Sequence, residues 1–198
     1  MLKSFKLFNS LPVQLTAIIW VLFAVPVLGQ NEVSATTAWA KLPSILATIK
    51  EPVFKNKTYN ILDFGGKSGG VFDNTQVFKK AIQKCTNNGG GIVLVPAGKY
   101  FTGPIHLDNN VNLHLAEGSE IVFNTNPDAF PMVHTSFEGT ELMNYSPLIY
   151  AYNKHNVAVT GTGTLNGQGS NDKWWSWCGK PSYGWQKNSP DQKEDVNA

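Results

Sequence analysis

Residues 156–169 read NVAVTGTGTLNGQG, and Trp174 and Trp175 follow closely behind them. The stretch contains a short apolar strand, a turn marked by glycines, a second short strand and a final Gly-x-Gly. Strands this short are stable only when neighbouring strands supply partners for their backbone groups. The pattern therefore indicates one turn of a repetitive β-architecture.

An earlier segment has the same pattern. Asn110-Val111-x-Leu113 and Asn156-Val157-x-Val159 each lead through a glycine turn into another short strand, and they begin 46 residues apart. A repeat period in the low twenties is typical of a solenoid, and two turns of about 23 residues would give this offset. We therefore interpret the offset as two turns.

Most of the chain between residues 59 and 159 consists of short strands separated by turn residues. The expected strands cover 59–64, 92–95, 100–102, 105–107, 111–115, 120–123, 148–151 and 157–159, and a long loop covers 127–146. A β-sandwich also has short strands. However, no Asn-Gly or Asp-Gly pair joins adjacent strands as in a hairpin, and Asn and Gly recur at the corners. The prediction is an all-β, right-handed parallel β-helix.

One amphipathic helix precedes the strands. Asp73 and Gln76 have the spacing of a capping box, and residues 87–91 read NNGGG, which ends a helix. One face of the helix is apolar and carries Val77, Phe78, Ala81, Ile82 and Cys85. An open end of a solenoid exposes backbone groups and apolar interior, so we expect this helix to cap the first turn.

The N-terminus has the features of a secretory signal peptide, predicted to cover residues 1–29. Lys3 and Lys6 precede an apolar run from Leu15 to Leu28, and cleavage is expected after Gly29. A membrane anchor is the alternative, but about 14 apolar residues fall short of the roughly 20 that a spanning helix needs. We therefore expect a secreted or periplasmic protein with no membrane segment after cleavage.

The remaining regions follow from the same reading. Residues 30–58 form a lead-in segment with a short helix near 38–49, and residues 59–180 form the first turns of the β-helix. Residues 181–198 are a polar, loop-like run. A solenoid needs a cap at each end, and this run offers neither a helix nor a strand, so we expect the domain to be truncated on its C-terminal side.

Composition narrows the possible partners. The net charge of the 198-residue chain is +2, and all 16 basic residues are Lys. Both facts argue against nucleic acid as a partner, because Arg is the usual bidentate reader of phosphate. In an oxidising compartment the two cysteines, Cys85 and Cys178, allow one disulfide, with two buried thiols as the alternative.

The ordered set of motifs resembles the N-terminal part of the polygalacturonase-type glycoside hydrolases, family 28 of the pectin-lyase-like β-helix superfamily. The matching pieces run over residues 39–180: Asp63-Phe64-Gly65, Asp73-Asn74-Thr75, Gly89-Gly90-Gly91, Val95-Pro96-Ala97-Gly98, Thr102-Gly103-Pro104, Glu138-Gly139, Ser146-Pro147-Leu148-Ile149-Tyr150, Gly161-x-Gly163, Gly167-Gln168-Gly169 and Trp174-Trp175. Asn166 and Gly66 depart from the family pattern.

The resemblance implies inverting hydrolysis of a pectic, acidic polysaccharide. No two of the four His residues have metal-ligand spacing, so we expect no metal, and we expect no cofactor and a monomer when the protein is complete. The family's Asp cluster, Gly-His-Gly and Arg-x-Lys do not occur in this sequence, so we expect no catalytic residue here and place those residues on later turns. Glu138 is the candidate carboxylate for the substrate groove, and a loop carboxylate bonded to nearby backbone is the alternative. Trp174 and Trp175 are candidates for stacking on sugar, and the alternative is that the pair packs under the loop after this turn. A polysaccharide lyase or epimerase, or a non-catalytic glycan-binding β-helix, are the alternatives.

Overall fold

The computed structural model describes residues 38–187, and the chain divides into two units, residues 1–50 and 51–198. The predicted signal peptide and residues 188–198 of the polar run lie outside the described residues. In the first unit, α3 (Leu42–Thr48) lies where the short helix was predicted, with a proline in its first turn. Proline is favoured there because its missing N–H is not needed at a helix start.

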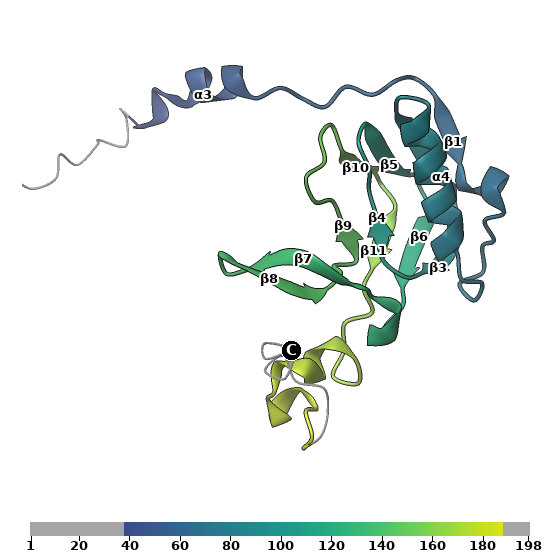
Figure 1. Ribbon diagram of the computed structural model, residues 1–198, viewed down its shortest axis with the longest axis vertical. Helices are drawn as coiled ribbons and strands as arrows, with labels where there is room; N and C mark the ends of the chain where they lie inside the picture. Colours follow the sequence, from purple (N-terminus) through teal and green to yellow (C-terminus); the bar gives the residue numbers. More distant parts are fainter. Residues whose placement is uncertain (1–37, 188–198) are drawn as a thin grey trace, which may run out of the picture. The chain divides into compact units, whose positions relative to one another are not determined.

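The second unit is a parallel β-helix (Figure 1). Sheet A has the strand order β1-β2-β5-β10, sheet B has β11-β6-β3, and sheet C has β4-β9. The chain visits the three sheets in turn, and every strand pair in them is parallel. The strands are β1 (Thr58–Asn60), β2 (Gly91–Val95), β3 (Gly98–Thr102), β4 (Ile105–His106), β5 (Val111–Leu115), β6 (Ser119–Phe123), β9 (Ile149–Tyr150), β10 (Ala158–Gly161) and β11 (Thr164–Asn166). The predicted fold class is confirmed.

Apolar side chains stack in register along the interior. Val93 pairs with Leu113, and both are fully buried. The next residue of that stack, Val159, is 42% exposed, and Leu165, stacked on the buried Ile121, is 44% exposed. Strands β10 and β11 have a partner on one side only within the described residues. Among residues 38–187, no strand pairs with the far side of this coil.

The register corrects our interpretation of the repeat. Ile92 pairs with Asn112, so the coil from β2 to β5 takes 20 residues (from 92 to 112). Asn112 also pairs with Ala158, and the offset of 46 (from 112 to 158) spans a single coil rather than two. The extra residues include an antiparallel hairpin, β7 (Met132–Phe137) and β8 (Thr140–Tyr145), inserted between β6 and β9.

This hairpin also corrects the predicted loop at 127–146. A short 3-10 turn (Pro127–Ala129) leads into it, and it projects from the coil (Figure 1). Glu138 and Gly139 form its two-residue turn, with φ angles of 49° and 84°. Two successive positive φ values are what a tight hairpin turn requires. The turn therefore consists of Glu-Gly, whereas the sequence analysis considered only Asn-Gly and Asp-Gly as signs of a hairpin.

The capping helix is α4 (Thr75–Asn87), and its buried residues are the five predicted ones. It packs against β1, β2, β4 and β5. The predicted capping box is wrong in detail. Asn74 is the N-cap residue, and the Asp73 carboxylate instead accepts a hydrogen bond from the backbone N–H of Thr75 at 2.9 Å.

Two other predicted elements differ in extent. The strand predicted at 59–64 ends at Asn60 and gives way to a 3-10 turn, Ile61–Phe64. The side chain of Asn60 accepts a hydrogen bond from Leu62 N, and Gly65 closes the turn in the left-handed region, so local capping overrides strand propensity. Two further 3-10 turns, Trp174–Cys178 and Pro181–Tyr183, follow β11.

Candidate functional site

A groove lies on the outer side of sheet C, beside α4. It encloses about 450 Å³. One wall comes from α4 and the other from β4, β9 and the corners that follow them. The polar and aromatic side chains that line it are Thr75, Gln76, Lys79, Gln83, His106, Asp108, Tyr150, Tyr152 and Lys154.

Strand alternation places the aromatic residues of this groove. Ile105 is buried in the interior, so the next residue, His106, points outward, and its register partner in β9 is Tyr150. The rings of His106 and Tyr150 lie 5.0 Å apart. The ring of Tyr152 is parallel to that of Tyr150, at an interplanar angle of 5° and a centroid distance of 6.4 Å. The groove floor is therefore an aromatic platform.

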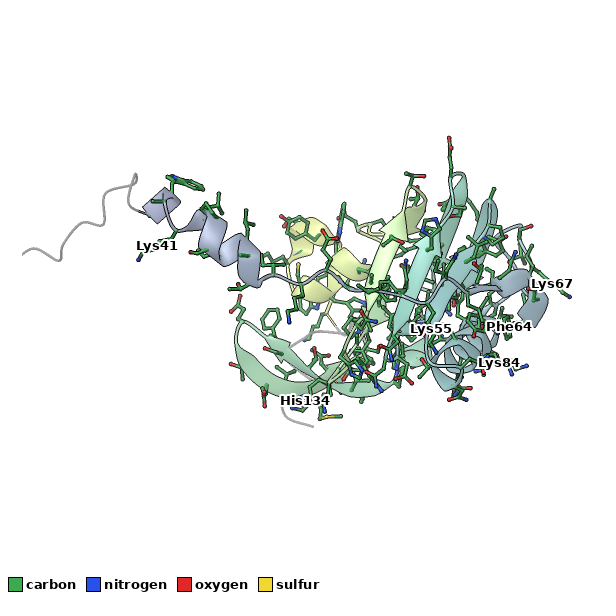
Figure 2. The ribbon with its side chains drawn as sticks, turned by 90° about the horizontal axis from the view of Figure 1, so that it is seen from above. Lys41, Lys55, Phe64, Lys67, Lys84 and His134 are labelled. Carbon is green, nitrogen blue, oxygen red and sulfur yellow. The ribbon has the colours of Figure 1, made fainter. Side chains whose placement is uncertain are left out.

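Polar contacts hold this platform in place. The Tyr150 hydroxyl donates a hydrogen bond to the His134 carbonyl at 2.7 Å, and the His134 ring packs on Tyr152 at 4.8 Å. His134 belongs to β7 and carries a label in Figure 2. Its Nε2 lies 3.5 Å from a Glu141 carboxylate oxygen. The base of the hairpin therefore braces the platform.

His106 and Ser146 form a close pair, with 2.8 Å between Nε2 and Oγ. Burial and the positive charge of Lys79 both lower the pKa of His106, so its imidazole is neutral at neutral pH. A Ser–His pair raises the question of nucleophilic catalysis. Ser146 is only 5% exposed and its hydroxyl also lies 3.0 Å from the Pro147 carbonyl, so the pair is structural.

The charges of the groove leave one cation without an ion pair. Lys154 Nζ lies 2.9 Å from Asp108 Oδ1, and this hydrogen bond lowers the pKa of the Asp108 carboxyl. Within residues 38–187, no carboxylate lies within ion-pair distance of Lys79. The wall formed by α4 therefore presents a net positive charge to the groove.

None of the three predicted substrate-binding residues lines this groove. Glu138 is exposed at the hairpin tip. Trp174 is half-buried; its indole N–H donates to the Gly167 carbonyl at 2.6 Å, and its ring packs on Phe130 and Trp177. Trp175 is exposed. Trp174 and Trp175 share the 3-10 turn Trp174–Cys178, whereas Glu138 lies in the turn of the hairpin, and the role of all three in substrate binding stays a prediction.

The sequence reasoning missed Tyr150, Tyr152, Lys79 and Lys154 as groove residues. Tyr150 is named in the sequence analysis only as the last residue of the motif Ser146-Pro147-Leu148-Ile149-Tyr150. The usable signal was the Tyr-x-Tyr spacing at the end of a strand, which puts alternate residues on one face. Lys79 carried no signal, because an exposed helical Lys is usually only solvated.

Two of the described carboxyls have the opposite of a general acid's environment. A general acid requires a raised pKa. Hydrogen bonding instead lowers the pKa of two carboxyls: Asp108, through Lys154, and Glu120, through Asn166 and then Lys99. Among residues 38–187 no cluster of three or more His, Cys, Asp or Glu side chains could hold a metal ion. In the same range, no helix is long and apolar enough to span a membrane.

The predicted disulfide is wrong, because both cysteines are free. Cys85 lies on the inner face of α4, where it is fully buried, and this burial raises the pKa of its thiol to about 11. Cys178 is exposed at the end of the 3-10 turn Trp174–Cys178.

Comparison with known proteins gives consistent matches. Residues 58–118 match the family model of rhamnogalacturonase A/epimerase, pectate lyase-like proteins. An exopolygalacturonase from Thermotoga maritima is 43% identical, with a TM-score of 0.76, over 81% of this chain and 36% of its own. A family 28 exopolygalacturonase from Yersinia enterocolitica is 28% identical, with a TM-score of 0.52, over 58% of this chain and 21% of its own.

Curated sequences agree with the structures. A protein of Vitis vinifera described as a probable polygalacturonase is 29% identical over 125 residues, which are 59% of this chain and 25% of the relative. The chain thus spans between a fifth and about a third of the length of these relatives. By sequence and by fold, the chain is thus similar to the polygalacturonase-type glycoside hydrolases, and its residues 58–118 match the pectate lyase-like family model.

Proposed function

We propose that the protein is a polygalacturonase-type glycoside hydrolase that cleaves pectic polysaccharide with inversion. The observation that carries the proposal is the likeness to the Thermotoga maritima exopolygalacturonase, at 43% identity over 81% of the chain. A likeness of this extent covers side chains as well as backbone path. It supports a common reaction more strongly than a shared fold alone would, because one fold can host many activities.

The groove on sheet C supports this proposal independently. Parallel tyrosine rings offer flat apolar surface, His106 offers a neutral polar edge, and Lys79 offers positive charge. Pectic polymers combine pyranose rings with carboxylates, so each of these features has a counterpart in the substrate. The groove also follows one outer face of the coil, as a site for a long polymer would.

The catalytic carboxylates are proposed to lie on coils outside the described residues. Inverting hydrolysis needs one carboxylic acid to protonate the leaving oxygen and one carboxylate to activate water. The described carboxyls instead serve in turns and ion pairs, as Asp73, Asp108 and Glu120 do. We therefore expect the 198-residue chain alone to bind substrate but to show no turnover.

The proposal also covers the localisation of the protein and its oligomeric state. The predicted signal peptide would deliver the protein to the periplasm or the exterior, where pectic polysaccharide is found, and we expect it to act as a monomer without a cofactor. Glu138 at the hairpin tip and the exposed ring of Trp175 remain candidates for contacts with more distant parts of the polymer.

An assay of the full-length protein on polygalacturonate tests the proposal. New reducing ends without ultraviolet-absorbing unsaturated products are the expected result. Unsaturated products would instead mean a lyase, and a change in uronate configuration without cleavage would mean an epimerase. Binding without any of these changes would identify a glycan-binding module, and each of the last three results would overturn the hydrolase.

A further inference from the structure

The groove combines two features that have no structural partner. Tyr152 is 51% exposed, although its ring contacts the His134 ring at 4.8 Å and lies parallel to the Tyr150 ring at 6.4 Å. Lys79 is an exposed cation on the facing wall, and within residues 38–187 no carboxylate compensates it. A rigid apolar face beside an unpaired positive charge suits a ligand that has both an apolar face and a negative charge.

The surrounding contacts pre-organise this arrangement. The Tyr150 hydroxyl is engaged by the His134 carbonyl at 2.7 Å, so the platform loses little freedom when a ligand binds. Asp108 is the one carboxylate among the groove's side chains, and its charge is matched by Lys154 at 2.9 Å. An incoming anion therefore meets a neutral pair on one wall and a free cation on the other.

We infer that this groove is a uronate subsite, in which Tyr152 stacks on a pyranose ring and Lys79 binds the carboxylate of the same or the adjoining sugar. The inference rests on the proposed function and adds to it a binding site on the first coils. A simple anion such as phosphate would use Lys79 but not the ring. A neutral sugar would use the ring but gain nothing from Lys79.

Four variants of the full 198-residue chain test this subsite, with tetragalacturonate as probe and neutral galactotetraose as its comparison. Lys79→Gln removes the charge. Its control is Lys84→Gln, because Lys84, labelled in Figure 2, is an exposed lysine of the same helix. Lys84 does not belong to the residues that line the groove. Tyr152→Ala removes the platform, and Tyr183→Ala is its control, an exposed tyrosine outside the groove.

Isothermal titration gives the dissociation constants. We expect Lys79→Gln to weaken tetragalacturonate binding about fivefold and to leave galactotetraose binding unchanged, because an exposed ion pair contributes up to about 1 kcal/mol. We expect Tyr152→Ala to weaken the binding of both sugars about three- to tenfold, the range of a single aromatic contact. Both control variants should bind like the wild type. Added salt should weaken only the tetragalacturonate.

Three results would overturn the subsite. In the first, the chain does not bind tetragalacturonate. In the second, wild type and Lys79→Gln bind it with the same dissociation constant. In the third, Lys84→Gln weakens its binding as much as Lys79→Gln does. Lys79 lies on the exposed face of α4, so its variant is informative even if Tyr152→Ala fails to fold. The outcome is separable from the hydrolase assay. Hydrolysis by the full-length protein together with unchanged Lys79→Gln binding refutes the subsite alone. Lys79-dependent binding without hydrolysis by the full-length protein refutes the hydrolase alone.

Discussion

The side chain of Asn156 pairs with the backbone of Val53, 103 residues earlier in the chain. Its Oδ1 accepts from Val53 N at 3.0 Å, and its Nδ2 donates to Val53 O at 2.7 Å and to Asn110 Oδ1 at 3.1 Å. The amide thus copies the pairing of a neighbouring strand. It fastens the extended segment 51–57, which carries Lys55 (Figure 2), to the start of β10.

This pairing predicts that Asn156→Ala lowers the free energy of unfolding by about 2 kcal/mol. The change removes three hydrogen bonds, each contributing about 0.5–1.5 kcal/mol, some of which water replaces. Asn156 also has a positive φ of 53°, which Asn tolerates better than Ala does. Asn153→Ala is the matched control, because Asn153 has a φ of 52° without these bonds. Equal losses in urea denaturation would show that the bonds contribute nothing.

Buried Asn74 is predicted to be more costly to replace. Its Oδ1 accepts from Lys67 N, and its Nδ2 lies within hydrogen-bond distance of the carbonyls of Lys67, Phe72 and Phe101. Asn74→Ala removes the side-chain partner of Lys67 N, Lys67 O and Phe72 O at a fully buried position, while the Phe101 carbonyl keeps its bond from the backbone N–H of residue 74. We therefore expect a loss of about 3 kcal/mol. Asn56→Ala, at an exposed position, should change the unfolding midpoint little. A loss below about 1 kcal/mol for Asn74→Ala would contradict this account.

The stacking of β10 on β5 predicts a large difference between two glycines. A Cβ at Gly161 would approach the Leu115 carbonyl oxygen to 1.9 Å, whereas a Cβ at Gly65 meets nothing within 4 Å. Both have strongly positive φ, 99° and 90°, so the backbone strain of an Ala substitution, about 1–2 kcal/mol, is common to both. We expect Gly161→Ala to be clearly less stable than Gly65→Ala by thermal melting. Equal melting temperatures would mean that β10 does not stack on β5 as described.

His106 predicts a pH dependence of stability. Burial and Lys79 lower the pKa of His106 in the folded protein, whereas the unfolded chain takes up a proton near the ordinary value of 6.5. As the pH falls below 6.5, the unfolded state binds more protons than the folded state, so stability falls with it. His106→Asn should flatten the stability profile between about pH 5 and 7. An unchanged slope in that window would show that His106 titrates normally.

The sequence predicted what depends on local pattern. The buried face of α4 follows from helical spacing between a polar start and a glycine-rich end, and all five of its residues were identified. β5 was identified with its bounds, because Val111, Leu113 and Leu115 alternate with polar residues. The disulfide failed because the same helical pattern places Cys85 on the buried face, whereas the spacing of Cys178 from it carries no information on where Cys178 lies.

The site depends on register, which the sequence could not supply. The hairpin inserted between β6 and β9 lengthens one coil to about the length of two, so the offset of 46 has two interpretations. Only the structure brings Tyr150 beside His106 and His134 onto Tyr152. The groove residues come from four segments, namely α4, β4, β7 and β9 with the corner after it, so no continuous stretch of sequence marks the site.

The central claim is hydrolysis of a pectic polymer, and a time course of proton NMR spectra during digestion of polygalacturonate by the full-length protein tests it most directly. The account predicts new reducing-end anomeric signals, first of the inverted configuration, and no signal from an unsaturated ring. An olefinic proton signal, or a spectrum that does not change with time, would contradict it.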